Sequence, residues 1–241
     1  MKTAIIAHRG LTSSAPANTM AAFAAAMAVG VDGIETDVQQ SADGQLVLMH
    51  DERVDKLTTG RGLLKQYSLA DLRRLSFVGY PGCQIPTLSE LLTFLTVRHF
   101  TGLLNLELKT QHVRYPHIEA HLAALINGQK WPFKIVVSSF SATALRRFKK
   151  LAPTIDTALL FRCQSLQGRW LVHQGIINAY HPKWWWSKRR HHQGNVDWRV
   201  WTVNTKVRLE RCFEQEVAAV ITDQTVLAQQ IRSQIQGETR I

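Results

Sequence analysis

The sequence has no run of about 18 apolar residues, so we expect no helix that crosses a membrane. Cysteine is scarce: Cys83, Cys163 and Cys212 form an odd set without a close pair, which favours neither a disulfide framework nor a zinc site. The apolar stretch after Met1 is too short for a signal peptide. We therefore expect a cytoplasmic protein.

Acidic residues are few relative to basic ones. The 29 lysine and arginine residues outnumber the 18 aspartate and glutamate residues, which gives a formal net charge of +11. Excess positive charge favours anionic partners such as phosphate esters, nucleic acid or acidic membrane surfaces. The net charge alone does not choose among these three classes.

Short strand-like segments alternate with helical ones along most of the chain. Strands are expected at 2–7, 33–38, 45–50, 103–108, 134–138, 155–161, 175–179, 199–203 and 218–222. Helices are expected between them, for example at 19–29, with Asn18 as the N-cap, and at 88–97, 117–126, 143–151 and 207–216. About eight such βα units predict an α/β fold of the (β/α)8 TIM-barrel type. Residues 51–82 break the alternation, so we expect one domain over 1–241 with a small insertion after the second strand.

Ionisable side chains follow the apolar part of four predicted strands. These are His8–Arg9, Glu35–Asp37, His50–Asp51 and Glu107–Lys109. The active site of a β/α barrel lies at the C-terminal ends of its strands. We therefore expect these groups to converge on one rim of the barrel.

Three carboxylates belong to this set. Side chains alternate across a strand, so Glu35 and Asp37 point the same way, and Glu107 follows another strand. Carboxylates that converge repel one another unless a cation lies between them. A donor set made only of oxygen suits a hard divalent ion, Mg²⁺ or Ca²⁺, rather than zinc.

The remaining members of the set carry positive charge or titrate near neutral pH. Arg9 and Lys109 supply positive charge for an anionic substrate. His8 and His50 end different strands and suit a general base and a general acid. Metal-assisted hydrolysis of a phosphodiester is therefore one interpretation of these residues. The competing interpretation is that each motif is a solvated turn or a helix cap, but the joint occurrence on successive strands favours a site.

At these residues the chain resembles the glycerophosphodiester phosphodiesterase family. The segments that carry the resemblance are His8-Arg9-Gly10, Pro16-Ala17-Asn18-Thr19, Glu35-Thr36-Asp37, His50-Asp51, Thr58-Thr59-Gly60-Arg61-Gly62, Ile85-Pro86-Thr87-Leu88-Ser89-Glu90, Glu107-Leu108-Lys109, Ser138-Ser139-Phe140, Trp201-Thr202-Val203-Asn204 and Ile221-Thr222-Asp223. They lie in the family's order and span nearly the whole chain.

The resemblance implies a fold, a reaction and a cofactor. The fold is a TIM barrel with a small insertion after the second strand. The reaction is hydrolysis of a small-molecule glycerophosphodiester to glycerol 3-phosphate and an alcohol, with one divalent cation, Mg²⁺ or Ca²⁺. By resemblance, Glu35, Asp37 and Glu107 hold the metal ion.

The resemblance also implies how the substrate is bound and converted. By resemblance, His8 and His50 form the acid/base pair, and Arg9 and Lys109 bind the substrate phosphate. Trp201 packs near the glycerol moiety, against which its ring gives an apolar wall. Which histidine is the base, and whether water or the glycerol hydroxyl attacks, stays open.

Two positions depart from the family pattern. Ala17 replaces the glutamate of Pro-Glu-Asn-Thr, which removes a carboxylate close to the expected pocket. Gln224 follows Asp223 where the family has a proline shortly afterwards. Every residue expected to bind metal or transfer protons is retained, so we expect an active enzyme.

A basic aromatic segment follows the strand expected at 175–179. It contains Trp184, Trp185 and Trp186 and then Lys188, Arg189 and Arg190. One hypothesis is a transient membrane-surface contact, with indoles at the interface and cations against anionic headgroups. The alternatives are a partly buried tryptophan cluster with a solvated basic helix start, and stacking on single-stranded nucleic acid. We expect no nucleic-acid partner.

Two other function classes remain open at this point. The tryptophan segment favours a lysophospholipase D-like enzyme that acts on lysolipids at a membrane. Net charge and Ala17 favour a non-catalytic phosphate-binding barrel. Metal-dependent turnover of a glycerophosphodiester would exclude the latter.

Overall fold

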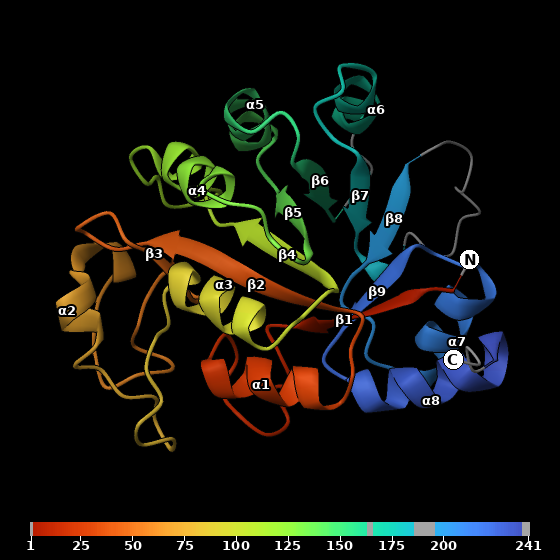
Figure 1. The fold of residues 1–241 in the computed structure, drawn as a ribbon, viewed down its shortest axis with the longest axis horizontal. Coiled ribbons are helices and arrows are strands. Elements are labelled where there is room, and N and C mark those ends of the chain that lie inside the picture. The colour runs from red at the N-terminus through yellow and green to blue at the C-terminus, as the bar shows by residue number, and fades with distance from the viewer. Residues whose placement is uncertain (1, 163–165, 186–195, 238–241) are drawn as a thin grey trace.

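Eight parallel strands close into a barrel in the computed structural model, which describes residues 2–162, 166–185 and 196–237 (Figure 1). The strands, in order around the barrel, are β1 (Ala4–His8), β2 (Gly33–Gln40), β4 (Leu103–Leu108), β5 (Lys134–Ser139), β6 (Asp156–Phe161), β7 (Ala179–Pro182), β8 (Asp197–Val200) and β9 (Ala219–Thr222). Strand β1 closes the barrel because it pairs with both β2 and β9. The predicted (β/α)8 TIM barrel is confirmed.

Helices surround the barrel and connect its strands. They are α1 (Met20–Ala28), α3 (Leu88–Val97), α4 (Ile118–Asn127), α5 (Ala142–Leu151), α6 (Leu166–His173), α7 (Lys206–Glu214) and α8 (Thr225–Gln236). In Figure 1, α1 and α8 lie below the barrel and α4, α5 and α6 above it. Five of them begin and end within two residues of the helices expected from the sequence.

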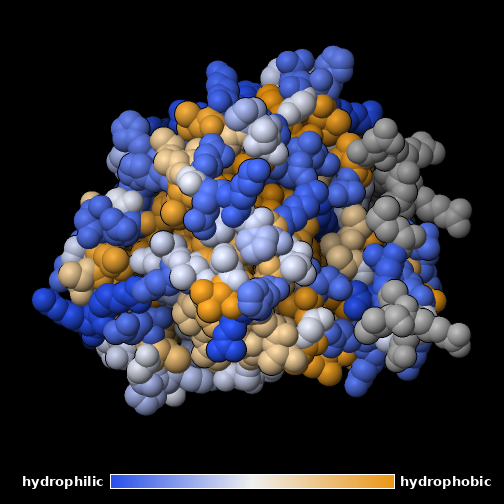
Figure 2. Space-filling model, viewed as in Figure 1, coloured by the Kyte–Doolittle hydropathy of each residue, from blue (hydrophilic) through white to orange (hydrophobic). Residues whose placement is uncertain are grey.

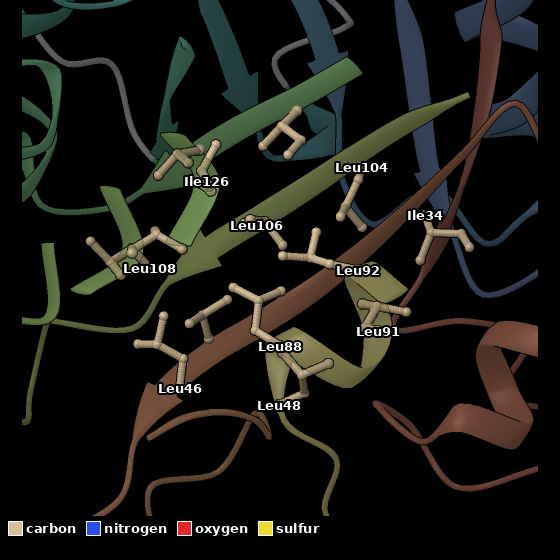
Figure 3. Packing of buried hydrophobic residues seen from close by; sticks show 14 of the residues in the cluster. Ile34, Leu46, Leu48, Leu88, Leu91, Leu92, Leu104, Leu106, Leu108 and Ile126 are labelled. Carbon is tan, nitrogen blue, oxygen red and sulfur yellow. The ribbon is translucent and has the colours of Figure 1, made fainter. Parts of the chain in front are cut away.

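The packing of α3 shows which side of β4 faces the barrel interior. Leu88, Leu91 and Leu92 are fully buried, and they form one cluster with Ile34 of β2 and with Leu104 and Leu106 on the outer face of β4 (Figure 3). Burial of each leucine stabilises the fold by about 1.5–3 kcal/mol. Because side chains alternate along a strand, the residues of β4 between these leucines point into the barrel.

The region between β2 and α3, residues 41–87, departs from the barrel pattern. It contains β3 (Leu46–Leu48), a short 3-10 helix (Leu64–Gln66) and α2 (Leu69–Leu72), which lie at the left of Figure 1. Strand β3 runs antiparallel to β2 and pairs with Val38–Gln40. The expectation that 45–50 is a barrel strand, with the insertion starting at 51, is therefore wrong. Strand β2 extends beyond the barrel and folds back as a hairpin, so the inserted region begins before β3.

The sequence pattern also misplaces the sixth barrel strand. A strand is predicted at 175–179, but β7 spans Ala179–Pro182. Residues 176 and 177 are apolar because Ile177 packs with Leu171 of α6, a helix that the pattern does not predict. Gly175, with φ of 64°, ends that helix in the left-handed conformation that glycine adopts without strain.

Among the described residues, no helix is long and apolar enough to span a membrane. Figure 2 shows hydrophilic residues over much of one face, with hydrophobic ones scattered between them. The most exposed of the large apolar side chains, Val97 and Val207, lie on different helices. Isolated apolar residues of this kind are ordinary on a protein surface.

Two of the six residues named in the basic aromatic segment, Trp184 and Trp185, lie among the described residues. Trp184 packs against the cluster that includes Val203 and Leu209, and the guanidinium of Arg208 lies 3.6 Å from its ring centroid. Trp185 is 39% exposed, and its Nε1 donates to the carbonyl of Arg162 at 2.8 Å. The rest of the hypothesis falls on Trp186, Lys188, Arg189 and Arg190, which lie outside the described residues. The packing of Trp184 agrees with a partly buried cluster, and the described residues do not support a membrane contact.

Candidate active site

Strand register places the expected site residues side by side at the carboxyl end of the barrel. His8 of β1 is the Cα partner of Glu35 on β2, and Asp37 is the partner of Glu107 on β4. The side chains of these four residues point into the barrel, because the intervening residues face the outer helices. The fold thus brings these four residues together at one rim.

Three carboxylates form a tight cluster. Glu35, Asp37 and Glu107 each present an oxygen within 4.8 Å of the oxygens of the other two. Glu35 and Asp37 are almost completely buried. Oδ1 of Asp37 is buried and accepts no hydrogen bond from the described residues. A buried oxygen of this kind calls for a partner, and a hard cation fits the donor set.

Burial and mutual repulsion perturb the acidity of this cluster. Burial, together with the charge of Asp37, raises the pKa of Glu35 to about 8. The pKa of Glu107 is raised for the same two reasons. Burial also acts to raise the pKa of Asp37, but nearby Arg9 and Lys109 outweigh it and the pKa falls below its usual value. The cluster thus keeps protons that a bound divalent cation would displace.

Two basic side chains border the carboxylates. Nε of Arg9 lies 3.0 Å from Oδ2 of Asp37. Nζ of Lys109 lies 3.1 Å from Oε1 of Glu107 and 3.6 Å from Oδ1 of Asp37. Both cations also line the cavity described below, so they can face an anionic ligand as well as the carboxylates.

The backbone at the end of β1 explains why glycine follows Arg9. Arg9 and Gly10 have φ of 59° and 84°, so the chain makes a left-handed turn here. The turn brings the amide of Arg9 to the main-chain carbonyl of Glu35 at 2.9 Å and to its Oε2 at 3.1 Å. A Cβ on Gly10 would lie 2.7 Å from the carbonyl carbon of Ala22 in α1. Glycine therefore allows α1 to pack against the site.

His8 is held between two carboxylates. Its Nδ1 lies 2.7 Å from Oδ1 of Asp223, and its Nε2 lies 4.0 Å from Oε2 of Glu35. Burial acts to lower the pKa of His8, but the hydrogen bond to Asp223 and the charge of Glu35 outweigh it, and the pKa is raised.

His50 reaches the same rim from the β3 hairpin. Its Nδ1 lies 2.7 Å from Oδ1 of Asp51. Burial lowers the pKa of His50 in spite of the nearby charge of Asp37. The pKa values of the two histidines are therefore displaced in opposite directions, as is common for groups with different acid and base roles.

The site residues line one cavity of about 370 Å³. Its walls include seven of the eight residues expected from the sequence: His8, Arg9, Glu35, His50, Glu107, Lys109 and Trp201. The eighth, Asp37, is fully buried behind Arg9 and Lys109. Trp201 contacts the ring of Phe140 edge-on, with centroids 5.6 Å apart, and its Nε1 donates to the carbonyl of His181 at 2.6 Å. These contacts fix an apolar wall on one side of the cavity.

Asn18 is a site residue rather than the helix cap expected from the sequence. The N-cap of α1 is Thr19, whose hydroxyl accepts from the amide of Ala22. Nδ2 of Asn18 donates to Oδ2 of Asp37 at 2.9 Å, and its Oδ1 accepts from the hydroxyl of Thr36 at 2.8 Å. Its φ of 60° turns the side chain toward β2. Its place beside the carboxylate cluster is visible only after β1 and β2 pair.

Ala17 does not line the cavity. It is half-buried next to Asn18, and the contacts of Asn18 with Asp37 are intact. The loss of the family glutamate therefore leaves the carboxylate cluster and its Asn18 hydrogen bond in place.

Two further polar residues meet the site from the end of the chain. Asp223 follows β9, and Asn204 lies in the loop after β8. Their only signal in the sequence is the resemblance of the segments that contain them. Neither segment suggested a contact with His8, because that contact spans 215 residues.

Comparison with known proteins identifies the family. Residues 8–227 match the model of the glycerophosphoryl diester phosphodiesterase family. The chain is 36% identical over 232 residues to a glycerophosphodiester phosphodiesterase of Caldanaerobacter subterraneus subsp. tengcongensis, an alignment that covers 92% of this chain and 95% of the relative. It is 38% identical over 185 residues to a glycerophosphodiester phosphodiesterase of Bacillus altitudinis, with 75% of each chain covered.

Solved structures share the barrel fold. A phosphodiesterase of Oleispira antarctica, in complex with the product sn-glycerol-3-phosphate, superposes with a TM-score of 0.84 at 27% sequence identity, over 95% of this chain and 96% of that one. A putative glycerophosphoryl diester phosphodiesterase from Agrobacterium tumefaciens shares the fold with a TM-score of 0.85 at 21% identity, over 99% of this chain and 100% of that one. The family model matches residues 8–227, and a relative that is 36% identical covers 92% of the chain. This chain therefore belongs to the glycerophosphoryl diester phosphodiesterase family.

Proposed function

We propose that this protein hydrolyses glycerophosphodiesters to sn-glycerol 3-phosphate and an alcohol. The observation that carries the proposal is a single cavity in which a buried carboxylate cluster, two histidines and two cations meet. Family membership supports it, and so does the product bound by the Oleispira antarctica phosphodiesterase. The protein is accordingly an enzyme, and a non-catalytic barrel is disfavoured.

A divalent cation fits the carboxylate cluster. Glu35, Asp37 and Glu107 would hold it, and the buried Oδ1 of Asp37, which accepts no hydrogen bond from the described residues, is one available donor. When all three carboxylates are ionised, they outnumber the two neighbouring cations, Arg9 and Lys109, so net negative charge remains for the ion to offset. When bound, the ion acts as a Lewis acid that polarises the phosphoryl oxygens of the substrate. The choice between Mg²⁺ and Ca²⁺ is a matter for measurement, since both accept oxygen ligands.

His8 and His50 would transfer the protons. Each has its Nδ1 on an aspartate, which leaves its Nε2 for the reacting oxygens. The raised pKa of His8 and the lowered pKa of His50 favour His8 as the acid and His50 as the base. Proton transfer of this kind contributes roughly 10²- to 10⁴-fold to rate.

Arg9, Lys109 and Trp201 would position the substrate. Arg9 and Lys109 lie on the cavity wall beside the carboxylates, where their charge suits a phosphate diester. The ring of Trp201, braced by Phe140, gives the carbon skeleton of glycerol an apolar surface.

The test is release of glycerol 3-phosphate from glycerophosphocholine and glycerophosphoethanolamine with Mg²⁺, with Ca²⁺ and with EDTA. We expect turnover with at least one ion and none with EDTA. Absence of turnover with every ion and substrate would refute the proposal. Lysophosphatidylcholine is assayed in parallel, because a lysolipid substrate stays a prediction from the sequence. The cytoplasmic location and the single-domain organisation also stay predictions.

A further inference from the structure

The carboxylate behind His8 comes from the opposite end of the chain. Oδ1 of Asp223 lies 2.7 Å from Nδ1 of His8, and the side chains of His8 and Asp223 are 16% and 29% exposed. The other ring nitrogen, Nε2, is 4.0 Å from Glu35 on the cavity side of the ring. An imidazole whose Nδ1 donates to a carboxylate must exchange its second proton at Nε2.

Asn204 fixes the orientation of Asp223. Oδ1 of Asn204 accepts from the main-chain amide of Asp223 at 2.9 Å and from the hydroxyl of Thr222 at 3.1 Å. A main-chain amide can only donate, so the oxygen of the Asn204 side chain must face it. Nδ2 of Asn204 then donates to Oδ2 of Asp223 at 2.5 Å. Each oxygen of the Asp223 carboxylate thus has its own donor.

We propose that Asp223, held by Asn204, is the positioning residue that keeps one proton of His8 on Nδ1 and directs Nε2 to the phosphodiester. The proposal rests on the proposed function. During the reaction, Nε2 exchanges a proton with a reacting oxygen, while Nδ1 keeps its own proton and Asp223 stays ionised. Asp223 does not line the cavity and contacts it through His8, so it acts through His8.

The partner of the second histidine is built differently. Asp51 follows His50 directly in sequence, and its side chain is about as exposed as that of Asp223. The other carboxylate oxygen of Asp51 has Lys56 Nζ at 3.7 Å, and the Lys56 side chain is 79% exposed. Among the described residues, no side-chain amide holds the carboxylate of Asp51 as Asn204 holds that of Asp223.

Asp223→Asn gives a sharp test because Asn204 decides how the new side-chain amide turns. Nδ2 of Asn204 still donates toward the former Oδ2 position, so the oxygen of the new amide takes that position. The NH₂ group of the new amide then faces His8 and donates to Nδ1, which moves the histidine proton to Nε2. We expect kcat to fall by roughly 10²- to 10⁴-fold with little change in KM.

The reciprocal double variant Asp223→Asn/Asn204→Asp should restore the tautomer. A carboxylate at position 204 can accept from the main-chain amide of residue 223, from Thr222 and from the NH₂ group of the new amide at position 223. The oxygen of that new amide then faces His8 and accepts its Nδ1 proton again. We expect the double variant to recover at least roughly tenfold of the lost kcat, a coupling usual for residues in contact. Asn204→Asp alone places two carboxylates next to each other, and we expect a low kcat for this single variant.

Nitrogen NMR of labelled histidine, with the divalent cation present, reports which ring nitrogen carries the proton. The His8 signals are assigned by their absence in His8→Gln. We expect a protonated Nδ1 in the native protein and in the double variant, and a protonated Nε2 in Asp223→Asn. Glu210→Gln, on the surface of α7, is the control for loss of one carboxylate and should match the native protein.

Three results would overturn the proposal: native-like kcat in Asp223→Asn, an unchanged Nδ1 proton in that variant, or no recovery in the double variant. Thermal melting shows whether each variant is folded, and the double variant keeps the native number of charges if Asp223→Asn alone is unstable. If the native protein releases no glycerol 3-phosphate, the proposed function fails. The NMR measurement still tests the tautomer in that case, so the two failures are distinguishable.

Discussion

At the scale of single residues, the neighbours of each carboxylate in the cluster shift its pKa. Asp37 is ionised because Arg9, Lys109 and Asn18 contact it despite its complete burial. For Glu35 and Glu107, the nearby positive charges do not offset burial and the charge of Asp37. Their pKa values are therefore raised, and they retain protons to higher pH than Asp37 does. The identities of these residues were predictable from their motifs, but their pairings were not, since they depend on which strands are neighbours.

Removal of one cluster oxygen tests the metal assignment. Glu107→Gln keeps the shape of the side chain but weakens a hard-ion ligand, so we expect kcat/KM to fall by roughly 10²-fold or more. Glu107 sits at the rim and not in the apolar core, so the melting temperature of the metal-free protein should not fall. Activity assays over a metal titration measure kcat/KM, and thermal melting in EDTA measures the melting temperature. Glu210→Gln is the control for both measurements. Native-like activity in Glu107→Gln would contradict the assignment.

The pKa of Glu35 predicts how pH acts on the metal-free protein. The folded state keeps a proton on Glu35 up to about pH 8, whereas the unfolded chain releases it near the ordinary value of 4.5. Between these values the folded state binds more protons, so rising pH favours unfolding. We expect the melting temperature of native protein in EDTA to fall between about pH 5 and pH 8 relative to that of Glu35→Gln.

The control for this prediction is saturating divalent cation. The ion displaces the proton and stabilises the ionised carboxylate, so the excess pH dependence of the native protein over Glu35→Gln should disappear. If native protein and variant show the same pH dependence in EDTA, Glu35 does not carry the raised pKa.

At the scale of elements, helix ends follow local sequence closely. Thr87 and Glu90 form a capping box at the start of α3: the Thr87 hydroxyl accepts from the amide of Glu90 at 3.2 Å, and Glu90 Oε2 accepts from the amide of Thr87 at 2.8 Å. The sequence gives the bounds of α3 correctly for this reason. The sequence pattern predicts β7 too early in the chain, because the apolar Ile176 and Ile177 lie in a loop that packs on α6.

The cap of α3 should contribute measurably to stability. Thr87→Ala removes the hydroxyl that accepts from Glu90, and we expect it to cost about 1 kcal/mol. Urea unfolding measures the loss. Thr93→Ala is the matched control, because Thr93 is exposed in the middle of the same helix and alanine there favours the helix slightly. Equal effects of the two substitutions would argue against the cap.

At the scale of the whole molecule, the barrel joins the two ends of the chain. Strand β1 pairs with β9, and Asp32 accepts from the amide of Ile5 at 2.7 Å while it contacts Arg232 of α8. The same closure delivers Asp223 to His8. The site is therefore complete only when β9 has docked.

The net charge of +11 should affect substrate capture. A positive protein attracts anions over distances that salt screens, with a Debye length of about 30 Å at 0.01 M and about 10 Å at 0.1 M. Glycerophosphoglycerol carries a net negative charge, whereas glycerophosphocholine is zwitterionic. We expect kcat/KM to fall more steeply with ionic strength for the former. Parallel salt dependence for the two substrates would show that the net charge does not steer substrate.

The sequence by itself determined the alternation of strands and helices, hence the barrel, and the identity of the carboxylates, histidines and cations at the strand ends. These follow from local periodicity and from motifs that a few adjacent residues carry. Only the tertiary structure decided that β3 is a hairpin arm outside the barrel, that Asn18 contacts Asp37 and that Asp223 contacts His8. Such contacts join residues far apart in the chain, and they exist only once strand register has brought those residues together.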